Sequence, residues 1–218
     1  MSSRFLSLDL LDIVLHLDVH LLEWVEAYGA WIYAILFAII FAETGFVVTP
    51  FLPGDSLLFV AGAIAATGSM NVHLLAALLI AAAILGNSIN YAIGRWLGKR
   101  FFVDRKSRWL NPKHLESARA FYERHGGKAV VLSRFLPIVR TYIPFVAGMA
   151  AMDARRYTAY NVAGGVLWVA SLLYAGFFFG NIPWVKGNLT AIIVGIIVVS
   201  LLPLVYAYVK SRLVRPRP

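Results

Sequence analysis

Long apolar runs alternate with short polar or basic segments along most of the chain. Three of these runs, residues 72–98, 157–180 and 188–209, reach the length of about 20 apolar residues that one helix needs to cross a bilayer. A fourth run, residues 29–42, is long enough when joined to the end of the segment before it. The pattern predicts an all-α polytopic membrane protein with a single membrane domain, residues 1–218.

The N-terminal segment, residues 5–26, is too polar to cross the bilayer. Its polar residues recur every three or four positions, which places them along one stripe of a helix, with Asp18 falling on the opposite face. We predict an amphipathic helix that lies in the membrane interface. Acidic residues occupy the positions where a signal peptide is basic and then apolar, so we predict no cleaved signal peptide. The residues of the stripe are Asp9, Asp12, His16, His20 and Glu23.

Turn-forming and charged residues break the apolar pattern between residues 43 and 69. Pro50, Pro53 and Gly54 lie in the middle of this segment. A continuous helix through them is not expected, because proline lacks an amide donor and clashes with the preceding turn. The apolar stretches on either side are each about half the ~20 residues of a full crossing. We therefore predict a re-entrant hairpin over residues 43–69, shaped by these three residues.

A second segment, residues 129–152, repeats the broken pattern, with interruptions predicted at Pro137 and Pro144. It is interpreted as a second re-entrant hairpin. The two segments also share a short motif, Val60-Ala61-Gly62 in the first and Val146-Ala147-Gly148 in the second. Paired interrupted segments at corresponding positions of two halves indicate a transporter site near the middle of the membrane.

Positive charge is concentrated in the segments that connect the apolar runs. The net charge is +9, only 14% of residues are charged, and the mean hydropathy is +0.74. A soluble domain has about 25% charged residues. Residues 99–128 form a basic segment with nine positive and three negative side chains, a net +6, and the C-terminal residues 210–218 are also basic. This placement favours anionic lipid head groups as partners and argues against nucleic acid.

The same charges predict an orientation, because positive loops remain in the cytoplasm. The basic segment 99–128 and both termini are expected on the cytoplasmic side. Counting crossings from there, the first hairpin enters and leaves at the outer face and the second at the inner face. The sequence thus predicts two halves of inverted topology.

Four charged residues lie in or beside the two hairpins, where each costs at least about 2.5–3.5 kcal/mol. Glu43 and Asp55 belong to the first hairpin, and Arg134 and Arg140 to the second. If the hairpins meet, each arginine can bind a carboxylate through two hydrogen bonds. Our hypothesis is that the acids exchange protons while the arginines hold an anionic head group, since arginine matches the geometry of phosphate. The alternative is that the four charges only join the hairpins.

Signals for other chemistry are weak or missing from the sequence. The chain has no Cys, which excludes thiolate catalysis and cysteine-ligated metals. It has no zinc-protease, nucleophile-elbow or phosphate-binding-loop motif, so we expect no enzyme and no cofactor. His16 and His20 are four residues apart and can share a metal, but a solvated stripe is the favoured interpretation, so no metal site is predicted.

The two interrupted segments resemble those of the DedA family of bacterial membrane proteins, also called the SNARE-associated or VTT-domain family. The resemblance covers nearly the whole chain, including residues 121–128 and 159–161. It is carried by FAETGFVVTPFLPGDSLLFVAG at residues 41–62 and SRFLPIVRTYIPFVAG at residues 133–148. The family's essential acids match Glu43 and Asp55, and its essential arginines match Arg134 and Arg140.

The resemblance implies a bacterial inner-membrane protein that supports envelope integrity and depends on the proton-motive force. It implies transport of an anionic lipid, either undecaprenyl phosphate or a phospholipid. Three interpretations remain open: a proton-coupled transporter or flippase, an uncoupled lipid scramblase, and a membrane scaffold or assembly factor without transport. Small residues in the apolar runs also permit a homo-oligomer.

Overall fold

The computed structural model describes residues 28–45, 54–101, 120–180 and 182–186, and the single positions 188 and 195. Within these ranges the ordered elements are helices and none is a strand, which confirms the all-α prediction. The helices are α3 (Trp31–Gly45), α4 (Gly54–Ala65), α5 (Val72–Phe101), η1 (Gly126–Lys128), α7 (Ala129–Leu132), η2 (Ser133–Phe135), α8 (Pro137–Met149), α9 (Ala154–Phe179) and α10 (Pro183–Lys186).

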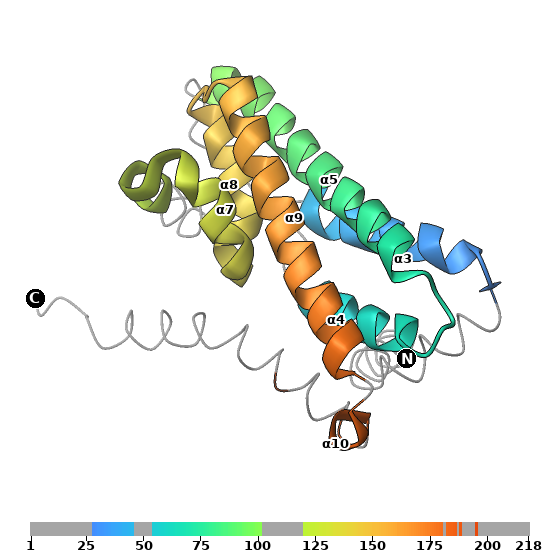
Figure 1. The fold of residues 1–218 in the computed structure, drawn as a ribbon. Helices are drawn as coiled ribbons and strands as arrows, with labels where there is room; N and C mark the ends of the chain where they lie inside the picture. The colour runs from blue at the N-terminus through green and yellow to red at the C-terminus, as the bar shows by residue number, and fades with distance from the viewer. Residues whose placement is uncertain are drawn as a thin grey trace, which may run out of the picture.

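Two described helices, α5 and α9, are long and apolar enough to cross a membrane, over Val72–Leu97 and Ala154–Phe179. They lie side by side and run in opposite directions (Figure 1), so that Tyr174 near the end of α9 hydrogen-bonds His73 at the start of α5. Both carry large apolar side chains on their outward faces, which suits a hydrocarbon environment. The predicted runs 72–98 and 157–180 are confirmed as helices of spanning length. Exposed side chains include Leu85, Ile89, Ile93, Val166 and Leu167.

Several sequence predictions fall outside the described residues. They are the interfacial helix over residues 5–26 and nearly all of the run 188–209. Most of the basic segment 99–128 also lies outside, as do Pro50 and Pro53.

Each of the two predicted breaks lies beside the first residue of a helix. In the first segment α3 ends at Gly45 and α4 begins at Gly54. In the second, extended Leu136 (φ −120°, ψ 101°) separates η2 from α8, whose first residue is Pro137. Proline suits the first position of a helix because the amide there has no helical partner.

The prediction of a second interruption at Pro144 is wrong, because α8 continues through it to Met149. Pro144 cannot donate to the carbonyl of Arg140, four residues earlier. Neighbouring helices can compensate for such a loss in membrane proteins. Here α8 is buried around Pro144 and packs along α5. This packing keeps α8 helical through the proline.

The short helices cross the long ones in two matching ways. Helix α4 packs on α9, where a Cβ on Gly62 or Gly176 would overlap the backbone of the facing helix. Helix α8 packs on α5, where Gly148 and Gly94 make the same kind of backbone contact. The repeated Val-Ala-Gly motif therefore marks two equivalent helix crossings, each between a short helix of one half and the long helix of the other.

Two apolar cores lie at opposite ends of this bundle. One core includes Leu79 and Leu173, and the other includes Tyr91 and Tyr157, which stack with ring centroids 4.0 Å apart. Each long helix therefore runs from one core to the other. Polar side chains occupy the layer between the cores, which is the region of the bundle where a functional site is expected. The buried polar residues of this layer are Glu43, Thr44, Asn87, Arg134, Thr141 and Asn161.

Candidate functional site: a buried charge cluster between the two cores

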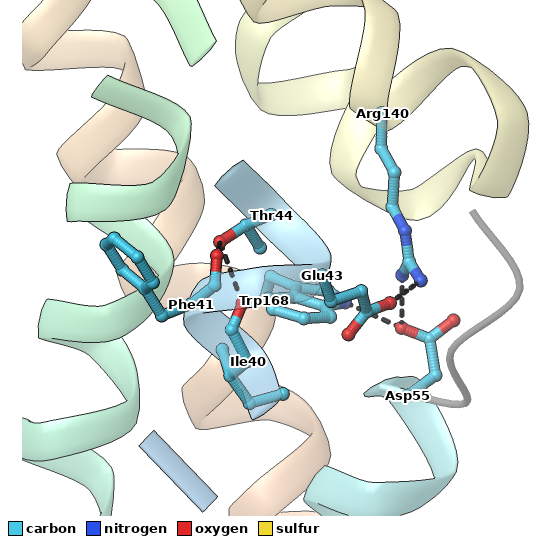
Figure 2. Close-up of polar contacts among 7 residues, drawn as sticks. All are labelled: Ile40, Phe41, Glu43, Thr44, Asp55, Arg140 and Trp168. Carbon is cyan, nitrogen blue, oxygen red and sulfur yellow. Dashed lines mark hydrogen bonds and ion pairs between the residues drawn. The ribbon is translucent and has the colours of Figure 1, made fainter. Parts of the chain in front are cut away.

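The Arg140 guanidinium connects the two acidic residues of the first segment. Its Nη1 donates to Asp55 Oδ1 at 2.8 Å, and its Nη2 forms an ion pair with Glu43 Oε1 (Figure 2). The Glu43 side chain is 1% exposed, that of Arg140 10% and that of Asp55 20%. Charge-assisted hydrogen bonds in a medium of low polarity are strong, and the loss of one partner leaves an uncompensated buried charge. The two interrupted segments therefore meet, and Arg140 is the contact between them.

Helix ends bring these three side chains together. Glu43 lies in the last turn of α3, and Asp55 is the second residue of α4. A negative side chain in the first turn of a helix also interacts favourably with the helix dipole. Gly54 is required for the approach of α4 to Glu43, because a Cβ on Gly54 would overlap both oxygens of the Glu43 carboxylate. Glycine thus gives the carboxylate room to reach Arg140.

Trp168 of α9 forms the wall of the cluster behind these charges (Figure 2). Its indole Nε1 donates to Asp55 Oδ1 at 2.9 Å. The Arg140 Cζ lies 5.5 Å from the centroid of the indole, within the range of a cation–π interaction. Asp55 Oδ1 is therefore held by two donors from different helices, and the indole contacts both charges of the pair.

Replacing Trp168 with phenylalanine is expected to weaken the hold on Asp55 while keeping an aromatic face for Arg140. A hydrogen bond to a charged group contributes about 1.5–3 kcal/mol, and the partial exposure of Asp55 places the expected loss of stability near the lower value. Thermal unfolding of the purified protein in detergent measures this loss. In an Asp55→Asn background the same substitution should cost less, because the acceptor is no longer charged. An equal cost in both backgrounds would contradict a specific Trp168–Asp55 interaction.

Arg134 occupies a separate, neutral cradle. Its side chain is buried, and its Nη2 donates to Asn161 Oδ1 at 2.7 Å and to the Ala83 carbonyl at 3.3 Å. With the Asn87 amide oriented to satisfy both neighbours, Asn87 accepts from Arg134 Nη2 at 3.0 Å and donates to the Thr44 carbonyl at 3.2 Å. Among the described residues Arg134 has no carboxylate partner. Among these residues its hydrogen-bond partners are amide and carbonyl groups.

A small cavity lies between the two arginines. Its volume is about 10 Å³, room for about one water molecule. The Trp168 ring faces both arginines, since the Arg134 Cζ also lies 5.9 Å from its centroid. In this conformation the cavity has no room for a ligand larger than water, so a larger anion binds only in another conformation. The cavity is lined by Glu43, Thr44, Asn87, Arg134, Arg140, Thr141 and Trp168.

The sequence-predicted site residues come together only in part. Glu43, Asp55 and Arg140 form one ion-paired cluster, whereas Arg134 lines the same cavity without reaching either acid. Pairing of each arginine with a carboxylate is therefore wrong for Arg134. Its guanidinium instead lies between α5 and α9, against Gly164, whose lack of a side chain makes room for it.

Two residues of the site were missed by the sequence analysis. Trp168 and Asn161 are seven positions apart on α9, or two helical turns, so they lie on the same helix face. A buried amide and a tryptophan on one face of an apolar run are a signal that could have indicated the site. Packing is the commoner role of such residues, so their pattern alone does not distinguish a packing role from a role in a functional site.

The site and fold define a class: an all-helical membrane protein whose interrupted segments place opposite charges in a buried cluster between long apolar helices. Residues 52–178 match the VTT domain, and the chain belongs to this family, the DedA family of membrane proteins. No solved structure matches the chain.

The relatives of the chain include proteins that are named as membrane proteins. The Escherichia coli (strain K12) protein DedA is 55% identical over 205 residues, which cover 93% of this chain and 94% of the relative. An uncharacterized membrane protein of Mycobacterium leprae is 40% identical over 187 residues, 84% of each chain. The inner membrane protein YghB of Escherichia coli (strain K12) is 40% identical over 155 residues, 71% of each chain. The expected family is thereby confirmed.

Proposed function

We propose that the protein is a proton-coupled transporter or flippase of an anionic lipid in the bacterial inner membrane, and not an enzyme. The observation that carries this proposal is the Arg140 guanidinium held between Glu43 and Asp55 beside a buried cavity. Ionisable residues inside a membrane are costly and mark substrate or proton pathways. The lipid class fits the two arginines, because guanidinium groups bind phosphate oxygens well. The candidate substrates are undecaprenyl phosphate and a phospholipid.

The ion pair supplies a physical means of coupling. While Arg140 holds both carboxylates, its guanidinium charge offsets theirs. When a phosphate group takes over Arg140, the acids lose their counter-charge in a buried environment, which favours the protonated form. Protonation and anion binding then support each other. Glu43 and Asp55 are the proposed proton-exchanging groups, and Arg134 and Arg140 bind the head group.

The proposed topology has two re-entrant halves of inverted orientation, with both termini in the cytoplasm. Two features of the structure support this arrangement. The crossings of α4 on α9 and of α8 on α5 use equivalent glycines, as an internal repeat requires. Asn87 and Trp168 line the cavity and lie near the middle of the two spanning helices, where transporters of repeated halves place their sites.

The test is movement of a labelled lipid in proteoliposomes with and without an imposed pH gradient. Labelled undecaprenyl phosphate and a labelled phospholipid serve as separate substrates. We expect the wild type to move one of them along with the gradient, and Glu43→Gln and Arg134→Ala to reduce gradient-driven movement at least tenfold. Arg155→Ala is the matched control, because Arg155 is an exposed arginine outside the cluster.

The other outcomes select between the remaining functions. Movement in the wild type that ignores the gradient indicates an uncoupled scramblase and removes the proton role of the acids. A protein that moves no lipid, but whose biological activity is rescued by exchanging an acid and an arginine within the cluster, is a scaffold whose charges serve folding alone.

A further inference from the structure

The charges of the cluster balance. Two carboxylates, Glu43 and Asp55, and two guanidinium groups, Arg134 and Arg140, lie around one cavity or in direct contact with its lining. The linking residues 46–53 contain no ionisable side chain. With all four groups ionised the cluster has no net charge. An anion that enters in this state adds a charge that nothing in the cluster compensates.

An uncompensated charge in a buried cavity is strongly disfavoured. The arginines cannot supply additional positive charge, because both are already ionised in the empty cluster. Loss of one carboxylate charge by protonation is the remaining way to restore balance within the cluster. Each negative charge that the ligand brings must then be accompanied by one proton.

The two acids differ in how firmly they hold their negative charge. Asp55 Oδ1 accepts from both Arg140 and Trp168, and its side chain is 20% exposed. Glu43 is 1% exposed, and Arg140 is its one side-chain donor among the described residues, while its Oε2 lies against Gly54. When Arg140 moves to a ligand, Asp55 keeps the indole donor and partial access to water. Glu43 keeps neither and is the acid that takes the proton.

The groups that face Glu43 from every neighbouring element of the described part of the chain are consistent with this assignment. Helix α4 contributes Asp55, and α8 contributes Arg140. Helix α5 contributes the uncharged Asn87, and α9 the uncharged Trp168. Arg134 of η2 lines the same cavity. Because its hydrogen-bond acceptors are uncharged, Arg134 keeps its positive charge available to a ligand.

We propose that anion binding at Arg134 and Arg140 is electroneutral, with Glu43 taking one proton for each negative charge of a phosphodiester lipid head group. This inference rests on the proposed function and adds its stoichiometry. The proton enters from solution to the Glu43 carboxylate as Arg140 transfers from Glu43 to the head group. It returns to solution when Arg140 pairs with Glu43 again.

The experiment measures proton uptake on binding, without transport. Purified protein in weakly buffered detergent at pH 8 is titrated with dihexanoyl phosphatidylglycerol, a phosphodiester with one negative charge, while a pH indicator reports proton uptake and calorimetry reports binding. We expect one proton per bound lipid in the wild type. In Glu43→Gln the cluster already has one excess positive charge, so we expect binding with no proton uptake.

A second ligand distinguishes the source of the phosphate and checks the charge rule. Geranyl phosphate is a monoester with about two negative charges at pH 8, since its second pKa is about 6. If it binds, the expected uptake is two protons in total, one on Glu43 and one on the phosphate itself, which then binds with a single negative charge. Tighter binding of geranyl phosphate identifies a prenyl phosphate as the substrate class, and tighter binding of phosphatidylglycerol identifies a phospholipid.

The assignment to Glu43 needs variants that keep the charge. In infrared difference spectra, binding of phosphatidylglycerol should produce the carbonyl band of a protonated carboxyl group. We expect this band to shift in Glu43→Asp and to stay in place in Asp55→Glu. A shift in Asp55→Glu alone would overturn the assignment.

Two further outcomes have separate meanings. Binding of phosphatidylglycerol to the wild type without proton uptake would overturn electroneutral binding and leave lipid binding intact. Failure of both lipids to bind would overturn this inference together with the proposed function.

Discussion

Replacing Arg140 with glutamine is expected to lower the free energy of unfolding by about 3–5 kcal/mol, the cost of breaking a buried ion pair from one side. Arg140 is the only side-chain donor to Glu43 among the described residues, and Glu43 is 1% exposed. The substitution leaves Glu43 and Asp55 close together without their ion-pair partner. Equilibrium unfolding in detergent, followed by circular dichroism, measures the loss.

Two controls separate this effect from a general loss of packing. Arg155→Gln removes an exposed arginine and should change stability by less than about 0.5 kcal/mol. The triple variant Glu43→Gln, Asp55→Asn, Arg140→Gln removes all three charges and should recover much of the stability, because no unpaired carboxylate remains and Arg134 keeps its uncharged hydrogen-bond acceptors. If Arg140→Gln is as stable as the wild type, water must reach the carboxylates, and a buried ion-paired cluster is excluded.

Replacing Gly54 with alanine is expected to reduce gradient-driven transport roughly a hundredfold and to lower the free energy of unfolding by about 3 kcal/mol. The added Cβ would overlap the Glu43 carboxylate, which lies at the end of a flexible side chain and can move away. When the carboxylate moves, it loses its ion pair with Arg140. Loss of an ion pair worth about 3 kcal/mol corresponds to roughly a hundredfold change in an equilibrium. The transport assay described above measures the transport rate, and thermal unfolding measures stability in parallel.

A second background shows whether Glu43 is the cause. In a Glu43→Ala protein the carboxylate is missing, so Gly54→Ala should have no further effect on stability or on lipid binding. A further loss in that background would show that Gly54 serves the backbone of α4 instead of the carboxylate. An unchanged transport rate in the single variant would contradict the role of the Glu43–Arg140 contact in coupling.

Much of the architecture follows from the sequence because membrane constraints are strong and local. The lengths of the apolar runs predicted helices over 72–98 and 157–180, and the structure has α5 and α9 there. Proline chemistry predicted a break at Pro137, since proline is tolerated at the start of a helix but disfavoured within it. The cost of a charge in hydrocarbon directed attention to Glu43, Asp55 and Arg140. These signals need no knowledge of which helices touch.

The tertiary structure decided the partners of these residues. Arg134 and Arg140 have the same chemistry and similar settings in the sequence, yet one binds two carboxylates and the other lies among amide and carbonyl groups. Pro144 lies inside α8 because the packed surroundings of that helix override the local preference. Trp168 belongs to the site because α9 packs where its indole reaches Asp55. Charge, length and backbone chemistry act locally and can be read from the sequence, whereas pairing depends on distances between segments far apart in the chain.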